Sequence, residues 1–232
     1  ETGVGAGELV PDLSYGSLTN FLTLGEANYQ LEITPANVEV PVVGRYDAPF
    51  STLNAGGLDF VVFASGFLDP SNNNNGPEFG LFAAAPGVGV LPLDELTAQL
   101  QLIHNVPDPA ASSVDIFVNG TRAFEDVNFR SGSPLDTVPG AGDIEVAVAA
   151  PGDSRSNALF TKTIDLPSDT TTVGVINGVL SANSGDYDDA DSLTLQAQKV
   201  TTSPSNSEFG LAINHGSPDA PSIDVTETGV GA

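Results

Sequence analysis

Short apolar stretches separated by clusters of Gly, Pro, Asn and Asp run through almost the whole sequence. They include "NYQLEITP", "GLDFVVFASGFL", "EFGLFAAA", "AQLQLIHN", "SVDIFVNG", "DIEVAVAA", "LFTKTIDL", "TTVGVINGVL", "DSLTLQAQKV" and "FGLAINHG". Many short strands with regularly spaced turns are typical of an all-β sandwich or barrel. Helical periodicity is nearly absent, and residues 91–103 predict one helical turn at most. The pattern therefore predicts an all-β chain.

The sequence is also internally duplicated. The stretch "IHNVPDPAASSVDIFVNG" around His104 is matched by "INHGSPDAPSIDVTETG" around His215. Beyond Gly120 the match continues only if the end of the chain is joined to its beginning, when "FEDVNFRSGSPLDTVPGAGDIEVAVAAPGD" aligns with "LVPDLSYGSLTNFLTLGEANYQLEITPAN". Further on, "TVGVINGVL" (172–180) matches "FVVFASGFL" (60–68). Two homologous units are expected, one of them split across the termini.

The two ends carry the same six residues, "ETGVGA". Glu1, Thr2, Gly3, Val4, Gly5 and Ala6 recur as Glu227, Thr228, Gly229, Val230, Gly231 and Ala232. The two histidines are 111 residues apart and the wrapped distance back is 115, which gives a period of 226. This favours a section of a head-to-tail tandem array, in which the six residues mark the seam between periods. A circularly permuted monomer with a chance terminal repeat is the alternative.

The repeat fixes the expected domain limits. One unit covers residues 99–206. The other covers residues 1–98 and is completed by residues 207–232 or by the equivalent segment of a neighbouring repeat, so residues 207–232 hold the opening strands of the next split unit. The alternation of Ile223 and Val225 with Asp224 and Thr226 predicts a half-buried strand just before the seam.

The turn motifs resemble a known family. "HNVPDPAASSVDIFVNG" and "HGSPDAPSID", each followed late in its unit by a strand such as "TVGVINGVL" or "FVVFASGFL", are similar to the bacterial and archaeal secreted family called domain of unknown function 4397. The resemblance covers nearly the whole chain and implies secretion, tandem copies and Ig-like antiparallel β-sandwich units, but no activity. The second unit departs from the pattern where "DVTETG" replaces the Asn-Gly turn.

Composition limits the partners. The chain has 30 Asp and Glu against 6 Lys and Arg, and its net charge of −24 disfavours nucleic acid and anionic lipid. It has no Cys, which excludes disulfides, thiolate zinc sites and thiol catalysis. Nothing resembles a Ser-His-Asp triad, a buried acid pair or a phosphate-binding loop, so no enzymatic activity is expected.

Three groups of polar residues remain as candidate sites. In the family turn motif, the histidines and aspartates are expected to brace the turn through hydrogen bonds; its members are His104, Pro107, Asp108, Asp115, His215, Pro218, Asp219 and Asp224. An acidic loop offers oxygen ligands for calcium, the one cofactor left open; its carboxylates are Asp186, Asp188, Asp189 and Asp191. The loop lacks the Gly and the closing Glu of an EF-hand, so a solvated acidic turn is the favoured interpretation. The polar loop containing Asn72–Asn75 suits either a sugar contact or a sandwich-edge loop.

These observations favour a structural role. The leading hypothesis is a repeat or subunit of a secreted filament, stalk or surface layer at a bacterial cell surface, whose partners are copies of itself joined covalently or by strand addition. The alternative is a cell-surface adhesin or glycan-binding module that uses sandwich loops. A third hypothesis is a spacer made rigid by calcium.

Overall fold

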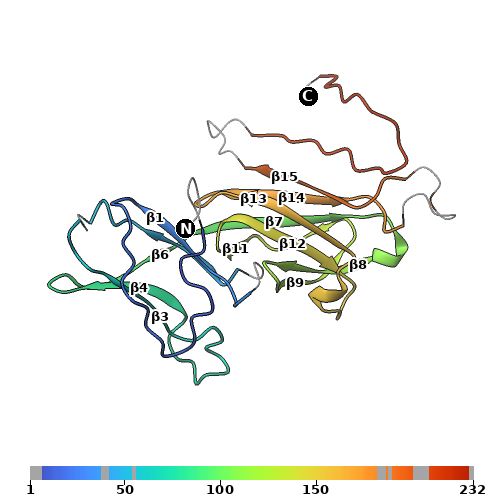
Figure 1. Ribbon diagram of the computed structural model, residues 1–232. Helices are drawn as coiled ribbons and strands as arrows, with labels where there is room; N and C mark the ends of the chain where they lie inside the picture. The colour runs from blue at the N-terminus through green and yellow to red at the C-terminus, as the bar shows by residue number, and fades with distance from the viewer. Residues whose placement is uncertain are drawn as a thin grey trace. The chain divides into compact units, whose positions relative to one another are not determined.

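The computed structural model of the chain describes residues 7–37, 42–53, 56–181, 187, 190–200 and 209–229. Apart from two single-turn 3-10 helices, η1 (Pro109–Ala111) and η2 (Arg155–Asn157), the regular elements of these residues are β-strands. The all-β prediction is confirmed (Figure 1). No helix in the described part of the chain has the length and apolar character needed to cross a membrane.

The described residues form fifteen strands. They are β1 Tyr29–Ile33, β2 Gly44–Ala48, β3 Val61–Ser65, β4 Gly80–Ala85, β5 Gly89–Pro92, β6 Asp94–Glu95, β7 Thr97–Asn105, β8 Ser113–Val118, β9 Thr121–Asn128, β10 Ser131–Gly132, β11 Asp136–Pro139, β12 Gly142–Ala149, β13 Phe160–Leu166, β14 Thr171–Asn177 and β15 Thr194–Lys199. The sheets have the strand orders β1-β2-β6, β3-β4-β5, β10-β7-β14-β15 and β13-β12-β8-β9, and β11 also pairs with β7. Residues 91–103 hold only strand residues and short connections, with no helical turn.

The chain divides into two compact units. Unit 1 comprises Glu1–Ala98, Thr137–Ile144 and Asp165–Asp169, and unit 2 comprises Gln99–Asp136, Glu145–Ile164 and Thr170–Ala232. The chain first passes from unit 1 to unit 2 between Ala98 and Gln99, and the repeat in the sequence does not predict its two short returns to unit 1.

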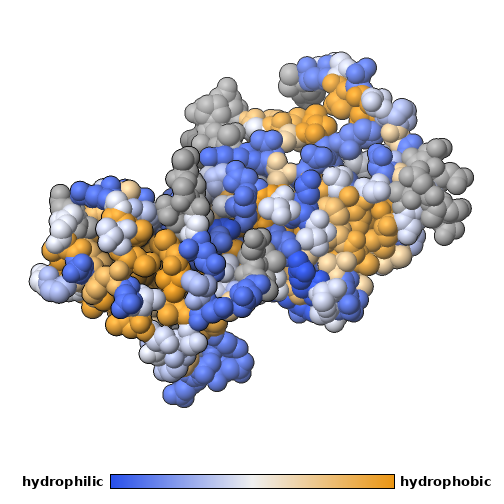
Figure 2. Space-filling view, viewed as in Figure 1, coloured by the Kyte–Doolittle hydropathy of each residue, from blue (hydrophilic) through white to orange (hydrophobic). Residues whose placement is uncertain are grey.

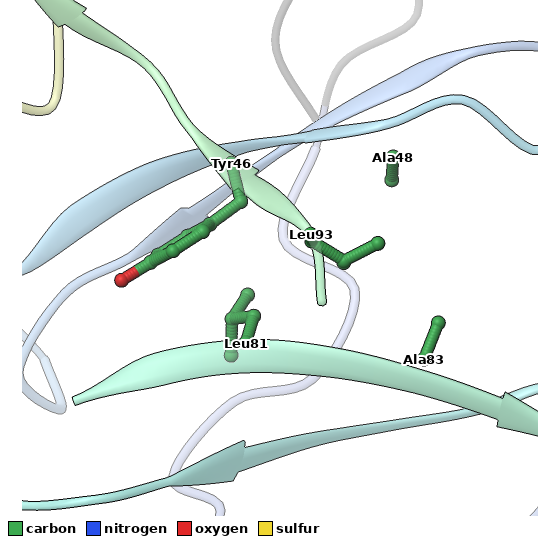
Figure 3. Close-up of a cluster of buried hydrophobic side chains, with 5 residues drawn as sticks. All are labelled: Tyr46, Ala48, Leu81, Ala83 and Leu93. Atoms are coloured by element: carbon green, nitrogen blue, oxygen red, sulfur yellow. The ribbon is translucent and has the colours of Figure 1, made fainter. Parts of the chain in front are cut away.

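Unit 1 has a small apolar core made by strands of two different sheets. Tyr46 and Ala48 on β2 face Leu81 and Ala83 on β4, and Leu93 joins them (Figure 3). β4 alternates buried and half-buried residues, because successive side chains point to opposite faces of the sheet and one face, with Leu81 and Ala83, lies on the core. Partly buried apolar side chains surround this core; they are Tyr29, Leu31, Ile33, Phe50, Phe60 and Phe79.

In unit 2 the strand before the His-Pro-Asp turn lies inside a sheet. β7 has Leu100, Leu102 and His104 fully buried, with half-buried or exposed residues between them. β14 pairs with β7 in parallel and with β15 in antiparallel orientation. The sheet is therefore mixed, which corrects the expectation of purely antiparallel sheets. The parallel pair arises because a long segment, containing β8 to β13, separates the two strands in the sequence.

The two halves share a specific backbone feature after β3 and β14. Gly66 follows β3 with φ +92°, and Gly178 follows β14 with φ +97°. A Cβ atom would lie 2.0 Å from a backbone carbonyl oxygen at Gly66 and 2.2 Å from one at Gly178, so only glycine fits either position. The next residues form isolated parallel bridges, Phe67 with Glu78 and Val179 with Ser192. Residues 60–68 and 172–180, which align in sequence, thus have the same structural role.

Two strand predictions are wrong for this chain. The stretch "FGLAINHG" and the alternation around Ile223 and Val225 were expected to form strands, yet residues 209–229 carry no strand assignment and are mostly exposed (Figure 1). A strand exists only if a neighbouring chain segment accepts its backbone hydrogen bonds. The alternating pattern is present, but no ladder partner for it is found in the described residues.

Candidate functional site

The turn after β7 is organised around a buried histidine. His104 is fully buried, and its Nε2 donates a hydrogen bond to the Ala111 carbonyl oxygen at 2.7 Å. The ring also meets Phe129 edge-on, with 6.2 Å between ring centroids. Burial lowers the pKa of His104, although the hydrogen bond to Ala111 opposes this. The His104 side chain thus closes the turn through a hydrogen bond to its backbone.

Asp108 connects the same turn to the end of β14. One carboxylate oxygen accepts the Ala110 N–H at 2.9 Å, which caps helix η1, and the other accepts the Leu180 N–H at 3.1 Å. The side chain is buried. The motif predicts a local brace of this kind, but it does not predict the bond to Leu180, because that residue lies 72 positions away.

Asp115, at the start of the "VDIFVNG" strand, is the most connected carboxylate of unit 2. It accepts a hydrogen bond and ion pair from the Arg122 guanidinium, and backbone hydrogen bonds from Asp126 (3.0 Å) and Gly152 (2.8 Å). It lies at an irregularity in the β8–β9 pairing, where Asp126 has φ +51°. Its charge is buried but satisfied by three donors, so it fixes β8, β9 and the loop after β12 together.

Asn119 forms the tight turn between β8 and β9. Its φ of +47° and that of Gly120 (+79°) suit the turn that the Asn-Gly pair predicts. Asn119 is buried, its Oδ1 accepts the Glu145 N–H at 3.0 Å, and its Nδ2 is buried without a hydrogen-bond partner. The sequon Asn119-Gly120-Thr121 is therefore closed to glycosylation once unit 2 has folded.

The second copy of the motif keeps the histidine hydrogen bond without the burial. His215 Nε2 donates to the Pro221 carbonyl oxygen at 3.1 Å, as His104 does to Ala111. The Asp219 carboxylate accepts the Ser217 hydroxyl at 3.2 Å. His215, Asp219 and Asp224 are all exposed, whereas their counterparts His104, Asp108 and Asp115 are buried.

Residues 98–226, more than half of the chain, match the family described as Domain of unknown function (DUF4397). The chain belongs to the DUF4397 family. The matched region runs from β7 through both histidine turns. A search of curated proteins found no match.

The scarce cations of this DUF4397 chain serve as structural ion pairs. In unit 1, the buried Arg45 pairs with Glu32 and donates to the carbonyl oxygens of Gly140 and Asp143. In unit 2, Arg122 pairs with Asp115, and Arg155 pairs with Glu145 and has a raised pKa because of it. Three of the six basic side chains are thus held by carboxylates of their own unit. The sequence does not predict these ion pairs, because their members are separated along the chain and belong to no recognisable motif.

The other candidate sites are only partly described. Asp186, Asp188, Asp189, the seam residues Glu1 to Ala6 and the residues Val230 to Ala232 lie outside the described residues. Asp191 is described, and its backbone bonds to Val179 and Pro218. No group of three or more potential ligands that could hold a metal occurs in the described part of the chain. Glu227, Thr228 and Gly229 are exposed.

The loop containing Asn72–Asn75 is folded around Asp69. The Asp69 carboxylate accepts hydrogen bonds from the Ser71 hydroxyl and from the backbone and side-chain amides of Asn72, which lower its pKa. Asn73 Nδ2 donates to the Asp69 carbonyl oxygen at 2.7 Å. The side-chain amides of Asn72 and Asn73 are thus engaged inside the loop.

The edge of unit 1 at β3 exposes apolar surface. β3 is the last strand of its sheet, and both Val62 and Phe63 are 37% exposed. Figure 2 shows apolar residues gathered on the surface in the region where Figure 1 draws β3 and β4. An apolar strand at the edge of a sheet tends to pair with another strand. The arrangement therefore suits an interaction between chains.

Proposed function

We propose that the chain is a structural repeat or subunit of a secreted extracellular array, such as a filament, stalk or surface layer, in which Ig-like sandwich units follow each other head to tail. The observation that carries the proposal is the shared glycine-and-bridge feature at Gly66 and Gly178, which supports two homologous units in one 226-residue period. The recurrence of "ETGVGA" at that period supports continuation from one copy to the next.

Other properties agree with this role. The large negative charge keeps a concentrated extracellular material soluble. The polar groups of the DUF4397 turn are used inside the turn: His104, Asp108 and Asp115 all bond to groups of unit 2. In a repeat array, stability is the sum of the stabilities of the units and of the interfaces between them.

Sedimentation velocity and electron microscopy of the purified 232-residue chain test the proposal. We expect the mean mass to rise with protein concentration and linear assemblies to appear. A single species of 23.7 kDa at every concentration, with no assemblies in the micrographs, would contradict it.

A further inference from the structure

We propose that β3 of unit 1 takes up residues 209–215 of a second copy of this chain as an added, parallel strand. The proposal rests on the head-to-tail array proposed above and specifies the contact that joins its members. It is argued from unit 2, where the corresponding strand is in place.

The acceptor is the open edge of β3. In the register of β3 with β4, Val62 lies opposite Ala83 and Ala64 lies opposite Leu81, whose side chains are buried in the unit 1 core. Val62 therefore faces the core side of the sheet and is nevertheless 37% exposed. The corresponding strand of unit 2, β14, has a neighbour on each side, and its Ile176 is fully buried. The difference is the strand that β7 provides in unit 2.

The donor is the counterpart of β7. When His215 is aligned with His104, Leu211 and Ile213 correspond to Leu100 and Leu102. Leu100 and Leu102 are completely buried, whereas Leu211 and Ile213 are 74% and 59% exposed. Phe209, two residues earlier on the same alternating face, is 81% exposed. Residues 209–215 thus have the alternating apolar side chains of a core strand, but these side chains are exposed.

The known pair predicts the register of the proposed one. β7 and β14 align Leu102 with Gly174 and His104 with Ile176. Transferred through the aligned residues, this places Ile213 opposite Val62 and His215 opposite Ala64. Val62 is larger than Gly174 and Ala64 is smaller than Ile176, so the two exchanges offset each other in volume. Cores tolerate exchanges that conserve total volume.

The N-terminal segment of unit 1 supports the same conclusion. Residues 7–28 correspond to the region of β9 to β11, where both β10 and β11 pair with β7. Val138 on β11 is 5% exposed, while its counterpart Leu22 is 53% exposed. A strand added at β3 would supply the neighbour that this segment lacks. One missing strand therefore explains exposed apolar side chains in two parts of unit 1.

The donor segment is attached to its own unit 2 just beyond the proposed strand. Asn105 Nδ2 donates to the Gly216 carbonyl oxygen at 3.4 Å, and the Asp191 N–H donates to the Pro218 carbonyl oxygen at 3.0 Å. These contacts hold the turn of the segment at unit 2 and involve none of residues 209–215. The strand residues are thereby left for the unit 1 of another copy.

The absence of cysteine makes disulfide trapping a clean test. Val62→Cys and Ile213→Cys are made in separate full-length chains, which are mixed and oxidised. Adjacent strands lie about 4.8 Å apart, within the Cα separation that a disulfide spans. We expect a disulfide-linked dimer of twice the 23.7 kDa chain mass in the mixture, at a yield at least about tenfold above that of either variant alone.

Two matched controls define the edge and the register. Val90→Cys is on β5, at the opposite edge of the same sheet, and should give no dimer with Ile213→Cys. Phe209→Cys is four residues out of register, about 13 Å along a strand, and should give none with Val62→Cys. If circular dichroism shows that either test variant is misfolded, Ala64→Cys with His215→Cys provides a second pair in the same register.

The outcomes separate this proposal from the proposed array. Assemblies that form without cross-linking of either pair overturn the strand addition and leave the array standing. A chain that neither assembles nor cross-links overturns both. Cross-linking within one chain of the doubly substituted Val62→Cys/Ile213→Cys protein, at monomer mass, overturns the second copy as donor, because the strand would then complete unit 1 of its own chain.

Discussion

Strand β7 and its counterpart at residues 209–216 have the same alternating pattern and different structures. β7 pairs with β14 along seven residues, and its apolar side chains are buried. The counterpart has a histidine at the same position and apolar residues at the same spacing, yet it forms no strand and remains exposed. The pattern specifies which face of a strand will be buried. Whether burial occurs depends on a partner edge, and unit 1 leaves such an edge open at β3.

The two copies of the DUF4397 turn also show which of its hydrogen bonds are local and which depend on tertiary packing. The hydrogen bond from histidine Nε2 to a backbone carbonyl forms in both copies, at 2.7 Å and 3.1 Å. It depends on residues only six or seven positions apart. The long-range bonds of Asp108 and Asp115 belong to a unit whose strands are all present. The histidine hydrogen bond therefore forms both with and without the packing that buries His104.

The largest expected effect is on matched core residues. Leu102→Ala should lower the free energy of unfolding of unit 2 by about 3–5 kcal/mol, because it leaves a cavity next to Gly174 in a fully packed sheet. Ile213→Ala should change the stability of the unassembled chain by less than about 0.5 kcal/mol, because that side chain is exposed. Urea denaturation at a concentration where sedimentation shows monomer measures both.

Equal losses for the two substitutions in the monomer would break the comparison. They would mean that residues 209–216 are already packed in a single chain. In assembled protein, by contrast, Ile213→Ala should lower the free energy of unfolding. A larger loss in assembled protein than in dilute protein would show that Ile213 is buried only on assembly.

The second-largest expected effect is a loss of stability at Asp115, compared with its counterpart Asp224 in the second copy of the motif. Asp115→Asn should destabilise unit 2 by about 2–3 kcal/mol, because it removes the charge that Arg122 and two backbone N–H groups share in a buried site. Asp224→Asn is the matched control, since Asp224 is exposed and the change should cost nothing measurable in the monomer. Thermal unfolding of both variants beside the unaltered chain provides the measurement. A loss confined to Asp224→Asn would reverse the assignment of buried and exposed copies.

The sequence predicts the fold class and most of the strands, but little about which strands pair with each other. Alternation and turn residues were enough for the all-β class and for most strands, because period-2 burial is a local property. The parallel contact of β14 with β7 could not be predicted, because it depends on which strands meet across some 70 intervening residues. The role of Asp115 was predicted in part. The family motif includes this residue, but the sequence does not show that Arg122 and Gly152 are its hydrogen-bond partners. The sequence did not predict the burial of Arg45, which donates hydrogen bonds to three backbone carbonyl oxygens of its unit.

The smallest expected effect is a pH dependence of stability that comes from the buried His104. Burial holds the pKa of His104 below the value near 6.5 of an unfolded histidine. Below that pH the unfolded chain takes up a proton that the folded chain does not, so stability should fall as the pH decreases from 6.5. The slope for one such group is at most about 1.4 kcal/mol per pH unit, until the pKa of the folded state is reached. His104→Gln retains an N–H donor for the Ala111 carbonyl and should remove this slope, whereas His215→Gln should leave it unchanged. Urea denaturation between pH 5.5 and 7.5 measures it, and a slope that persists in His104→Gln would show that another group is responsible.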